Sequence, residues 1–201
     1  MLTDIGTRPS DPPRDAAGIP ASRHPAAQRH AVGSRTLSDP CLTVFYHFDP
    51  WGGGVGGIDT LIRTWIRHAP HALRLRIVGA RREADGIGMW RRDRLCGKEV
   101  EFLPAIRIEA PNQRSRVPHT LRYAAALKRH GSALASDFMH FHRIEPVLAT
   151  RGWAGEKSLF FHLDVAHHLN VEGPGVEYTW RRWPAAYWAL ERRLIGRFDQ
   201  V

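Results

Sequence analysis

A glycine-rich turn between an apolar run and a periodic helix constrains the fold of this chain more than any other stretch. The run at residues 42–48 has the β-branched and aromatic composition of a buried strand. Five glycines follow within residues 52–57. After them, apolar side chains recur at helical spacing, namely Ile58, Leu61, Ile62, Trp65 and Ile66. A strand, a glycine turn and a helix together predict the first half of a βαβ unit.

Such a turn has a use beyond joining two elements. Glycine permits positive φ and close backbone approach, and the free N–H groups at the start of a helix attract anions. Phosphate, diphosphate or a carboxylate would fit there, because ligands of open α/β sheets bind outside the carboxyl ends of the strands. The alternative is that the turn is only a connection at this edge of the sheet.

The remaining chain alternates short strands with helices. We expect strands at residues 73–79, 100–104, 138–142 and 158–162, and loops at 106–116 and 164–175. Helices are expected at 117–130, where Gly131 stops the helix, and at 144–150. A long helix ends near Arg197, and Pro184 either begins its regular part or kinks it. Five arginines, at 81, 82, 91, 92 and 94, follow the second strand. Short strands separated by helices favour parallel pairing with right-handed crossovers. The expected fold class is therefore α/β, with a Rossmann-like doubly wound, mostly parallel sheet and flanking helices.

The first part of the chain differs in composition from the rest. Residues 1–40 are rich in Pro, Ala, Ser, Asp and Arg and show no hydrophobic period, so we expect a disordered leader there. Residues 41–201 then form the folded domain. The leader is nearly neutral, so almost all of the formal net charge of +9 belongs to the folded part. That charge implies an acidic partner such as a nucleotide, an anionic sugar, a lipid surface or a nucleic acid.

Cysteine content and hydropathy bear on the compartment. Cys41 and Cys96 are the two cysteines and show no CxxC spacing, which favours a reducing interior. No apolar run has the length of a membrane span, and the N-terminus lacks the apolar core of a secretory signal. We therefore expect a cytoplasmic protein, either soluble or attached to the membrane surface.

Four short motifs follow one another along residues 56–201. They are Gly-Gly-Ile-Asp at 56–59, His-Phe-His at 140–142, Phe-Phe-His-Leu-Asp at 160–164 and Arg-Phe-Asp-Gln-Val at 197–201. Their order resembles that of family 4 glycosyltransferases, which have the GT-B architecture of two Rossmann domains. The first resembles the family's Gly-Gly-x-Glu turn, although Asp59 stands where glutamate is commoner. The second resembles its His-x-His strand, the third a second strand ending in histidine, and the fourth the strand entry that follows a long helix in the family. The resemblance covers residues 41–201 and leaves the family's donor-binding domain unmatched.

The resemblance implies a retaining enzyme that transfers a sugar from a nucleotide sugar to a sugar or lipid-linked acceptor, with no further cofactor. It implies that His162 and Asp164 line the reaction centre. It also implies that substrate and phosphate lie near Gly54, Gly56, Gly57, Asp59, His140 and His142. The chemistry is consistent, since a leaving diphosphate needs amides or cations and an acceptor hydroxyl needs a polar neighbour such as histidine. As the acceptor-side half, the chain is expected to be inactive without a donor-binding domain, and a separately encoded donor domain is a candidate partner.

Other uses of the same histidines remain open. Those of strand 138–142 lie on one side of it, and a buried histidine satisfied by a backbone carbonyl is an ordinary structural residue. A zinc site is a second alternative, drawing on His140, His142, His162, Asp164, His167 and His168. None of the fixed zinc spacings is present, so we expect no metal.

Two alternative functions also remain. Gly52, Gly54 and Gly57 match the pattern G-x-G-x-x-G of dinucleotide-binding oxidoreductases, but the turn is longer and Arg81-Arg82, rather than a ribose-binding carboxylate, follows the second strand. A non-catalytic anion-binding or interaction module, either a remnant or one subunit of a split enzyme, is the second alternative. The aromatic and basic residues at 180–198 fit core packing, an anionic membrane surface or nucleic acid. No nucleic-acid motif is present, so no nucleic-acid partner is expected.

Overall fold

The structure is a computed structural model that describes residues 39–52, 56–108, 117–160, 180 and 183–201. The expected leader lies almost wholly outside these residues. The described strands are β1 (Cys41–Phe45), β2 (Arg74–Arg81), β3 (Arg91–Leu95), β4 (Lys98–Arg107), β5 (Phe138–Phe141) and β6 (Glu156–Leu159). The described helices are α1 (Gly57–His68), α2 (His119–His130) and α4 (Pro184–Leu194), with the 3₁₀ helices η1 (Gly131–Leu134), η2 (Glu145–Ala149) and η4 (Ile195–Arg197).

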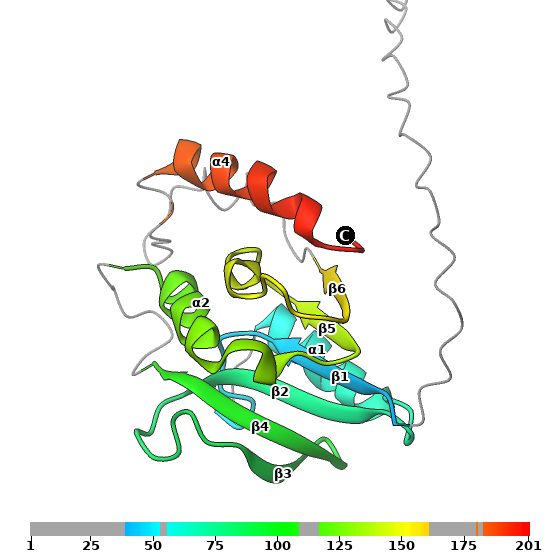
Figure 1. Cartoon of the computed structure of the whole chain (residues 1–201). Coiled ribbons are helices and arrows are strands. Elements are labelled where there is room, and N and C mark those ends of the chain that lie inside the picture. Colours follow the sequence, from blue (N-terminus) through cyan, green and yellow to red (C-terminus); the bar gives the residue numbers. More distant parts are fainter. Residues whose placement is uncertain (1–38, 53–55, 109–116, 161–179, 181–182) are drawn as a thin grey trace, which may run out of the picture. The chain divides into compact units, whose positions relative to one another are not determined.

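The described strands form one sheet in the order β3-β4-β2-β1-β5-β6 (Figure 1). Every pairing is parallel except that of β3 with β4. The chain builds outward from β1 through β2 to β4, and then returns to the other side of β1 to form β5 and β6. This is the doubly wound order, so the expected α/β, Rossmann-like and mostly parallel fold is confirmed. A parallel bridge between Ser158 and Gln200 lies beside β6, where the sequence predicts that a further strand starts.

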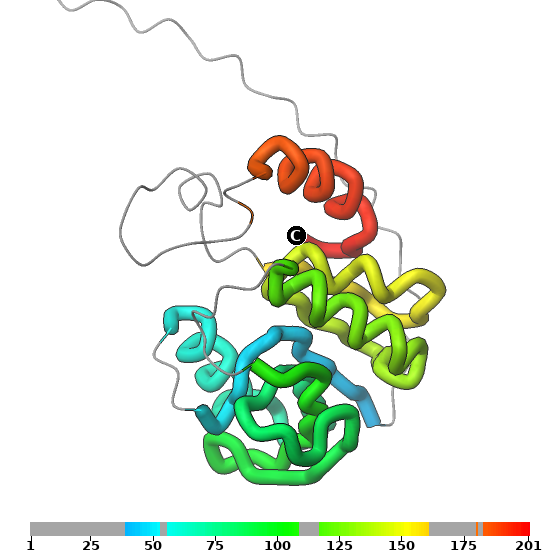
Figure 2. The backbone as a smooth tube through the Cα atoms, turned by 90° about the vertical axis from the view of Figure 1, so that its left-hand side faces the viewer, coloured from blue at the N-terminus to red at the C-terminus, as the bar shows by residue number. Residues whose placement is uncertain are grey.

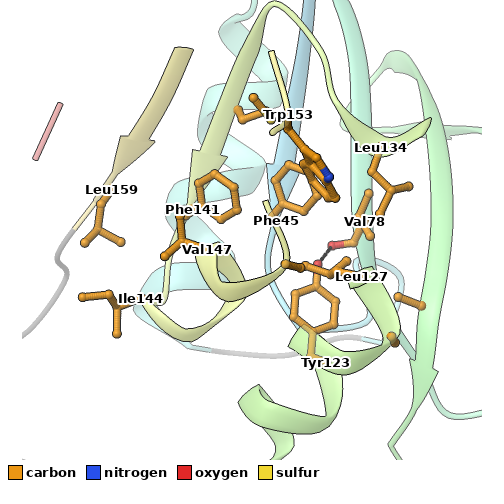
Figure 3. Packing of buried hydrophobic residues seen from close by; sticks show 14 of the residues in the cluster. Phe45, Val78, Tyr123, Leu127, Leu134, Phe141, Ile144, Val147, Trp153 and Leu159 are labelled. Carbon is orange, nitrogen blue, oxygen red and sulfur yellow. Dashed lines mark hydrogen bonds between the residues drawn. The ribbon is translucent and has the colours of Figure 1, made fainter. Parts of the chain in front are cut away.

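Hydrophobic side chains pack on both faces of the sheet. On one face α2, η2 and α4 contribute to a large cluster in which the rings of Phe45 and Phe141 stack with centroids 4.7 Å apart (Figure 3). η2 packs beside α2 in this layer (Figure 2). On the other face Ile62 and Ile66 of α1 pack against β1, β2 and β4. The residues that α1 contributes to this second cluster belong to the apolar stripe that the helical spacing predicts.

The sequence predicts no strand between residues 79 and 100, but the structure has one there, because β3 begins at Arg91. β3 is an edge strand, and edge strands tolerate charged side chains because one of their sides faces solvent. A tight turn joins it to β4, with Cys96 at φ 51° and Gly97 at φ 82°. Two residues of positive φ suit a two-residue hairpin, and the antiparallel pair follows from it.

β4 is also longer than the expected strand 100–104, and it runs through Pro104 to Arg107. The segment predicted as a loop at 106–116 therefore begins as strand, and residues 109–116 lie outside the described part. Pro104 is tolerated because β3 pairs with β4 only as far as Phe102. Beyond that point one side of β4 has no neighbouring strand, so the ladder does not need the N–H that proline lacks.

The helix ends agree with the sequence. Gly131 follows α2 at φ 61°, a conformation that glycine adopts without strain, and Pro184 is the first residue of α4. Tyr187 and Leu194 of α4 are buried in the large cluster, with Trp180 and Trp188 against it, whereas Trp183 is 52% exposed. Core packing therefore accounts for most of the aromatic residues in this segment.

Candidate functional site

The strand order places the candidate site at the carboxyl ends of β1 and β5. The chain leaves β1 toward β2 on one side, whereas β5 lies on the other side of β1 and is reached only after β4. In an open α/β sheet such a reversal is where ligands bind, because the segments that leave the two neighbouring strands diverge. The glycine turn follows β1, and His142 follows β5.

The backbone after β1 is held against β2 before it enters the turn. Tyr46 N–H donates to Val78 O at 3.2 Å, and Ala80 N–H donates to Phe48 O at 2.8 Å. This crossing needs glycine at position 79, since a Cβ there would lie 2.6 Å from Phe48 O. The segment leading to the turn is therefore fixed by contacts with β2, although β1 itself ends at Phe45.

A local contact links the end of the glycine turn to the first turn of α1. Gly56 precedes α1, and its N–H donates to the carboxylate of Asp59, whose pKa is raised by burial. A carboxylate in the first turn of a helix stabilises it through the helix dipole. An anionic ligand at this helix end would therefore meet the charge of Asp59. Among the described residues, no atom lies within 4 Å of a Cβ placed at Gly57, so packing against these residues does not require glycine.

His140 and His142 lie on the side of β5 that faces α1, as the alternation along a strand predicts. Their rings stack with centroids 4.9 Å apart and 8° between their planes. The indole of Trp65 on α1 lies 4.4 Å from the ring of His140 and 5.5 Å from that of His142. His142 is buried, and Phe160 after β6 packs edge-on against Trp65 at 5.3 Å. Two histidines thus share one aromatic environment beneath α1.

A second polar group faces α2 at the same edge of the sheet. His47 follows β1, and burial lowers its pKa to about 3, with the positive charges of Arg143 and His119 acting in the same direction. Its Nδ1 is buried and has no hydrogen-bond partner among the described residues. His47 is therefore neutral near pH 7, and a neutral imidazole can donate to or accept from a hydroxyl group.

Glu145, at the start of η2, is a buried carboxylate that joins two helical segments. Its Oε1 accepts hydrogen bonds from Thr120 Oγ1 and from Trp180 Nε1, both at 2.8 Å. Its Oε2 is buried without a hydrogen bond to any described residue. Nearby, burial raises the pKa of Tyr187 above its ordinary range, and the negative charges of Glu145 and Glu191 add to this effect. Glu145 therefore ties Trp180 to α2.

Tyr123 completes this side of the site from within α2. It is fully buried, and its hydroxyl donates to Val78 O, the carbonyl that also accepts from Tyr46 N–H (Figure 3). Burial raises the pKa of Tyr123 well above the ordinary value, so it stays a neutral donor. α2 is thereby anchored to the ends of β1 and β2.

The structure brings together some of the predicted site residues. Gly56, Gly57 and Asp59 form the entry to α1, and His140 and His142 form the stacked pair. Gly54, His162 and Asp164 lie outside the described residues, as do His167 and His168 of the zinc alternative. Within the described ranges, no three His, Cys, Asp or Glu residues cluster as metal ligands would.

Sequence reasoning missed several residues of this site. In the sequence pattern, Trp65 is one more apolar position of the helical stripe. Its contact with β5 follows only from the order of the strands in the sheet. Glu145 left a usable signal, because it stands between apolar residues in a segment expected to be a short helix. The only sequence signal for His47 and Arg143 is that each of them follows a predicted strand.

Comparison with known proteins adds no assignment, since neither the models of protein families nor the curated proteins give a match to this chain. None of the described helices combines the length and the apolar composition that a bilayer-spanning helix needs.

Proposed function

We propose that the chain is the acceptor-side domain of a retaining glycosyltransferase of the GT-B type, resembling family 4, which uses a nucleotide sugar and a sugar or lipid-linked acceptor. In this proposal the glycine turn approaches the phosphates, and the histidines near the carboxyl end of β5, with the histidine that follows β6 in the sequence, contact the acceptor. The donor is held chiefly by a second domain.

One observation carries the proposal. Trp65 belongs to the helix that the glycine turn starts, and it lies 4.4 Å from the ring of His140 on β5. The helix that follows the glycine turn thus packs on the strand that carries His140. Both the turn and this strand end at the edge of the sheet where the doubly wound order predicts a ligand.

The groups at this edge suit glycosyl transfer. A neutral His47 and the pair His140 and His142 offer hydrogen bonds to sugar hydroxyls, and aromatic rings such as Trp65 and Phe160 offer apolar faces. Cationic Arg143 follows β5 and can oppose the charge that develops on a leaving diphosphate. Asp59 caps α1, so the phosphates in this proposal contact the turn before the helix rather than the helix end.

The test is calorimetric titration of the full chain with nucleotide sugars and nucleoside diphosphates, alone and mixed with a donor-domain protein encoded beside it. We expect no transfer by the chain alone and, in the mixture, transfer together with binding of the nucleotide sugar that is tighter than any binding by the chain alone. Within the mixture, His140→Gln should lower transfer at least tenfold, while the exposed control His71→Gln should leave it unchanged. Transfer by the chain alone, or no binding in the mixture, would contradict the proposal.

A further inference from the structure

A cavity of about 570 Å³ opens at a different part of the molecule. Three segments line it: the end of α2 with the start of η1, the end of η2 with the turn after it, and η4. The residues that decide its chemistry are Lys128, Gly131, Arg151, Gly152, Trp153 and Arg197.

The cavity lies toward the amino edge of the sheet. η1 leads into β5, which begins at Phe138, and the turn after η2 leads into β6, which begins at Glu156. η4 leads to Gln200, which bridges in parallel to Ser158 of β6. Because these strands are parallel, all three lining segments meet at their amino ends. The glycine turn and the histidine pair lie toward the opposite edge.

Three cations converge on this cavity. Lys128, Arg151 and Arg197 are exposed, and none of them forms an ion pair with a carboxylate of the described residues. The described lining contains no Asp or Glu. Two carboxylates in the flanking segments accept backbone hydrogen bonds, Asp137 from Cys41 N–H at 3.0 Å and Asp199 from Lys157 N–H at 2.8 Å.

Helix dipoles alone do not account for this arrangement. A cation near the C-terminus of a helix is stabilised by the dipole wherever that helix ends. Here the cations come from three separate segments and border one cavity rather than three separate surfaces. Gly131 and Gly152 have φ of 61° and 78°, and a Cβ at either position would meet no atom of the described segments within 4 Å. At these points the cavity therefore has bare backbone, and buried Trp153 adds an apolar surface.

We propose that this cavity binds a diphosphate or a similarly charged phosphoryl group, held by Lys128, Arg151 and Arg197. A diphosphate carries about three negative charges near neutral pH, which matches three cations, and guanidinium groups bind phosphoryl oxygens through paired hydrogen bonds. The cavity volume leaves room for more than the phosphates alone. A soluble phosphate ester and a phospholipid headgroup share this chemistry. The proposal does not depend on the glycosyltransferase assignment.

The experiment titrates the full chain with inorganic pyrophosphate by calorimetry at low salt. We expect saturable binding, weakened about tenfold by Arg151→Gln and again by Arg197→Gln, because each variant removes charged hydrogen bonds. The matched control is Arg67→Gln, since Arg67 is also an exposed cation in the last turn of a helix. All three positions are exposed, and circular dichroism checks that each variant is folded. No binding by the native chain, or an equal loss in the Arg67 variant, would overturn the proposal.

A second arm identifies the source of the phosphoryl group. Flotation with phosphatidylcholine vesicles, with and without phosphatidic acid, measures binding to a lipid headgroup. Where pyrophosphate binds, binding to the acidic vesicles that is lost with Arg151→Gln and Arg197→Gln, but kept with Arg67→Gln, supports a headgroup as the ligand. Pyrophosphate binding without vesicle binding supports a soluble phosphate ester.

Discussion

The indole of Trp65 lies 4.4 Å from the imidazole of His140, with 45° between the two rings. The contact joins α1 to β5, and between these two elements the sequence passes through β2, β3, β4 and α2. Aromatic pairs at this separation contribute beyond the area that they bury. Trp65 is therefore both a structural link and the cover of the histidine pair.

Replacing Trp65 should measure this link. We expect Trp65→Ala to lower the free energy of unfolding by about 2 kcal/mol, below the range for a fully buried tryptophan because Trp65 is only partly buried. Trp65→Phe should lower the free energy of unfolding by less than half as much as Trp65→Ala does. Urea unfolding followed by circular dichroism gives both values. The control is Trp183→Ala, which removes an indole that is 52% exposed and should cost less than about 0.5 kcal/mol. Equal losses for the two alanine variants would contradict the role given to Trp65.

Glu145 should be more sensitive to loss of its oxygen atoms than to loss of its charge. Glu145→Ala leaves Thr120 and Trp180 without their acceptor, and we expect a loss of about 2 to 4 kcal/mol in the free energy of unfolding. Glu145→Gln retains a carbonyl oxygen and removes a buried charge, so it should stay within about 1 kcal/mol of the native chain. Chemical denaturation measures both, and an equally large loss for the glutamine variant would show that Oε1 is not the important acceptor.

The sequence predicted those parts of the fold that depend on local patterns. The stripe of Ile62 and Ile66, the stop at Gly131 and the start at Pro184 all follow from side chains that act within one element. β3 was missed because its arginines have no apolar period, and Cys96-Gly97 is a weak hairpin signal. A charged edge strand such as β3 is stabilised by its pairing with β4, and the residue pattern within β3 alone does not indicate that pairing.

The site divides in the same way. The stacking of His140 and His142 on one side of β5 follows from the two-residue period of a strand. The contact with Trp65 follows from the strand order, and the low pKa of His47 follows from what α2 and β5 place around it. Both features depend on contacts between segments that are distant in the sequence. Burial and electrostatics at the site therefore follow only from the order of the strands and helices, which local sequence patterns do not give.

His47 should make the chain less stable in mild acid. Its pKa is lowered from 6.5 to about 3, so the unfolded chain takes up a proton at a higher pH than the folded chain. The free energy of unfolding should therefore fall as the pH is lowered from about 6.5 toward 3, by at most about 1.4 kcal/mol per pH unit from this residue. Urea unfolding across this range should give a shallower pH dependence for His47→Gln than for the native chain.

The comparison needs a histidine without such an environment. His71 is exposed, so His71→Gln should leave the pH dependence of unfolding as it is in the native chain. Carboxylates contribute to acid unfolding in all three proteins, and the difference between the curves removes their contribution. Parallel curves for His47→Gln and the native chain would show that His47 is not held neutral by its surroundings.

Gly79 should be required for the fold. A Cβ at this position would lie 2.6 Å from Phe48 O and 2.9 Å from Phe102 Cε2, both closer than packing allows. We expect Gly79→Ala to lower the free energy of unfolding by about 1 to 3 kcal/mol, because the crossing of the 46–48 backbone over β2 must open. Thermal and urea unfolding measure this loss, and a variant as stable as the native chain would contradict the close approach.

Gly57 should respond in the opposite way, and this separates a structural glycine from one that a ligand requires. It begins α1 with open space around its Cβ position, so Gly57→Ala should raise the free energy of unfolding by about 0.5 kcal/mol. If the turn approaches the phosphates of a nucleotide sugar, the same variant should weaken binding several-fold in the mixture with a donor domain, because a methyl group keeps the phosphate from the backbone. Urea unfolding and calorimetry on one protein sample give the two values. A gain in stability with unchanged binding would make the turn a connection only, and the proposed function would then lose the support of its glycines.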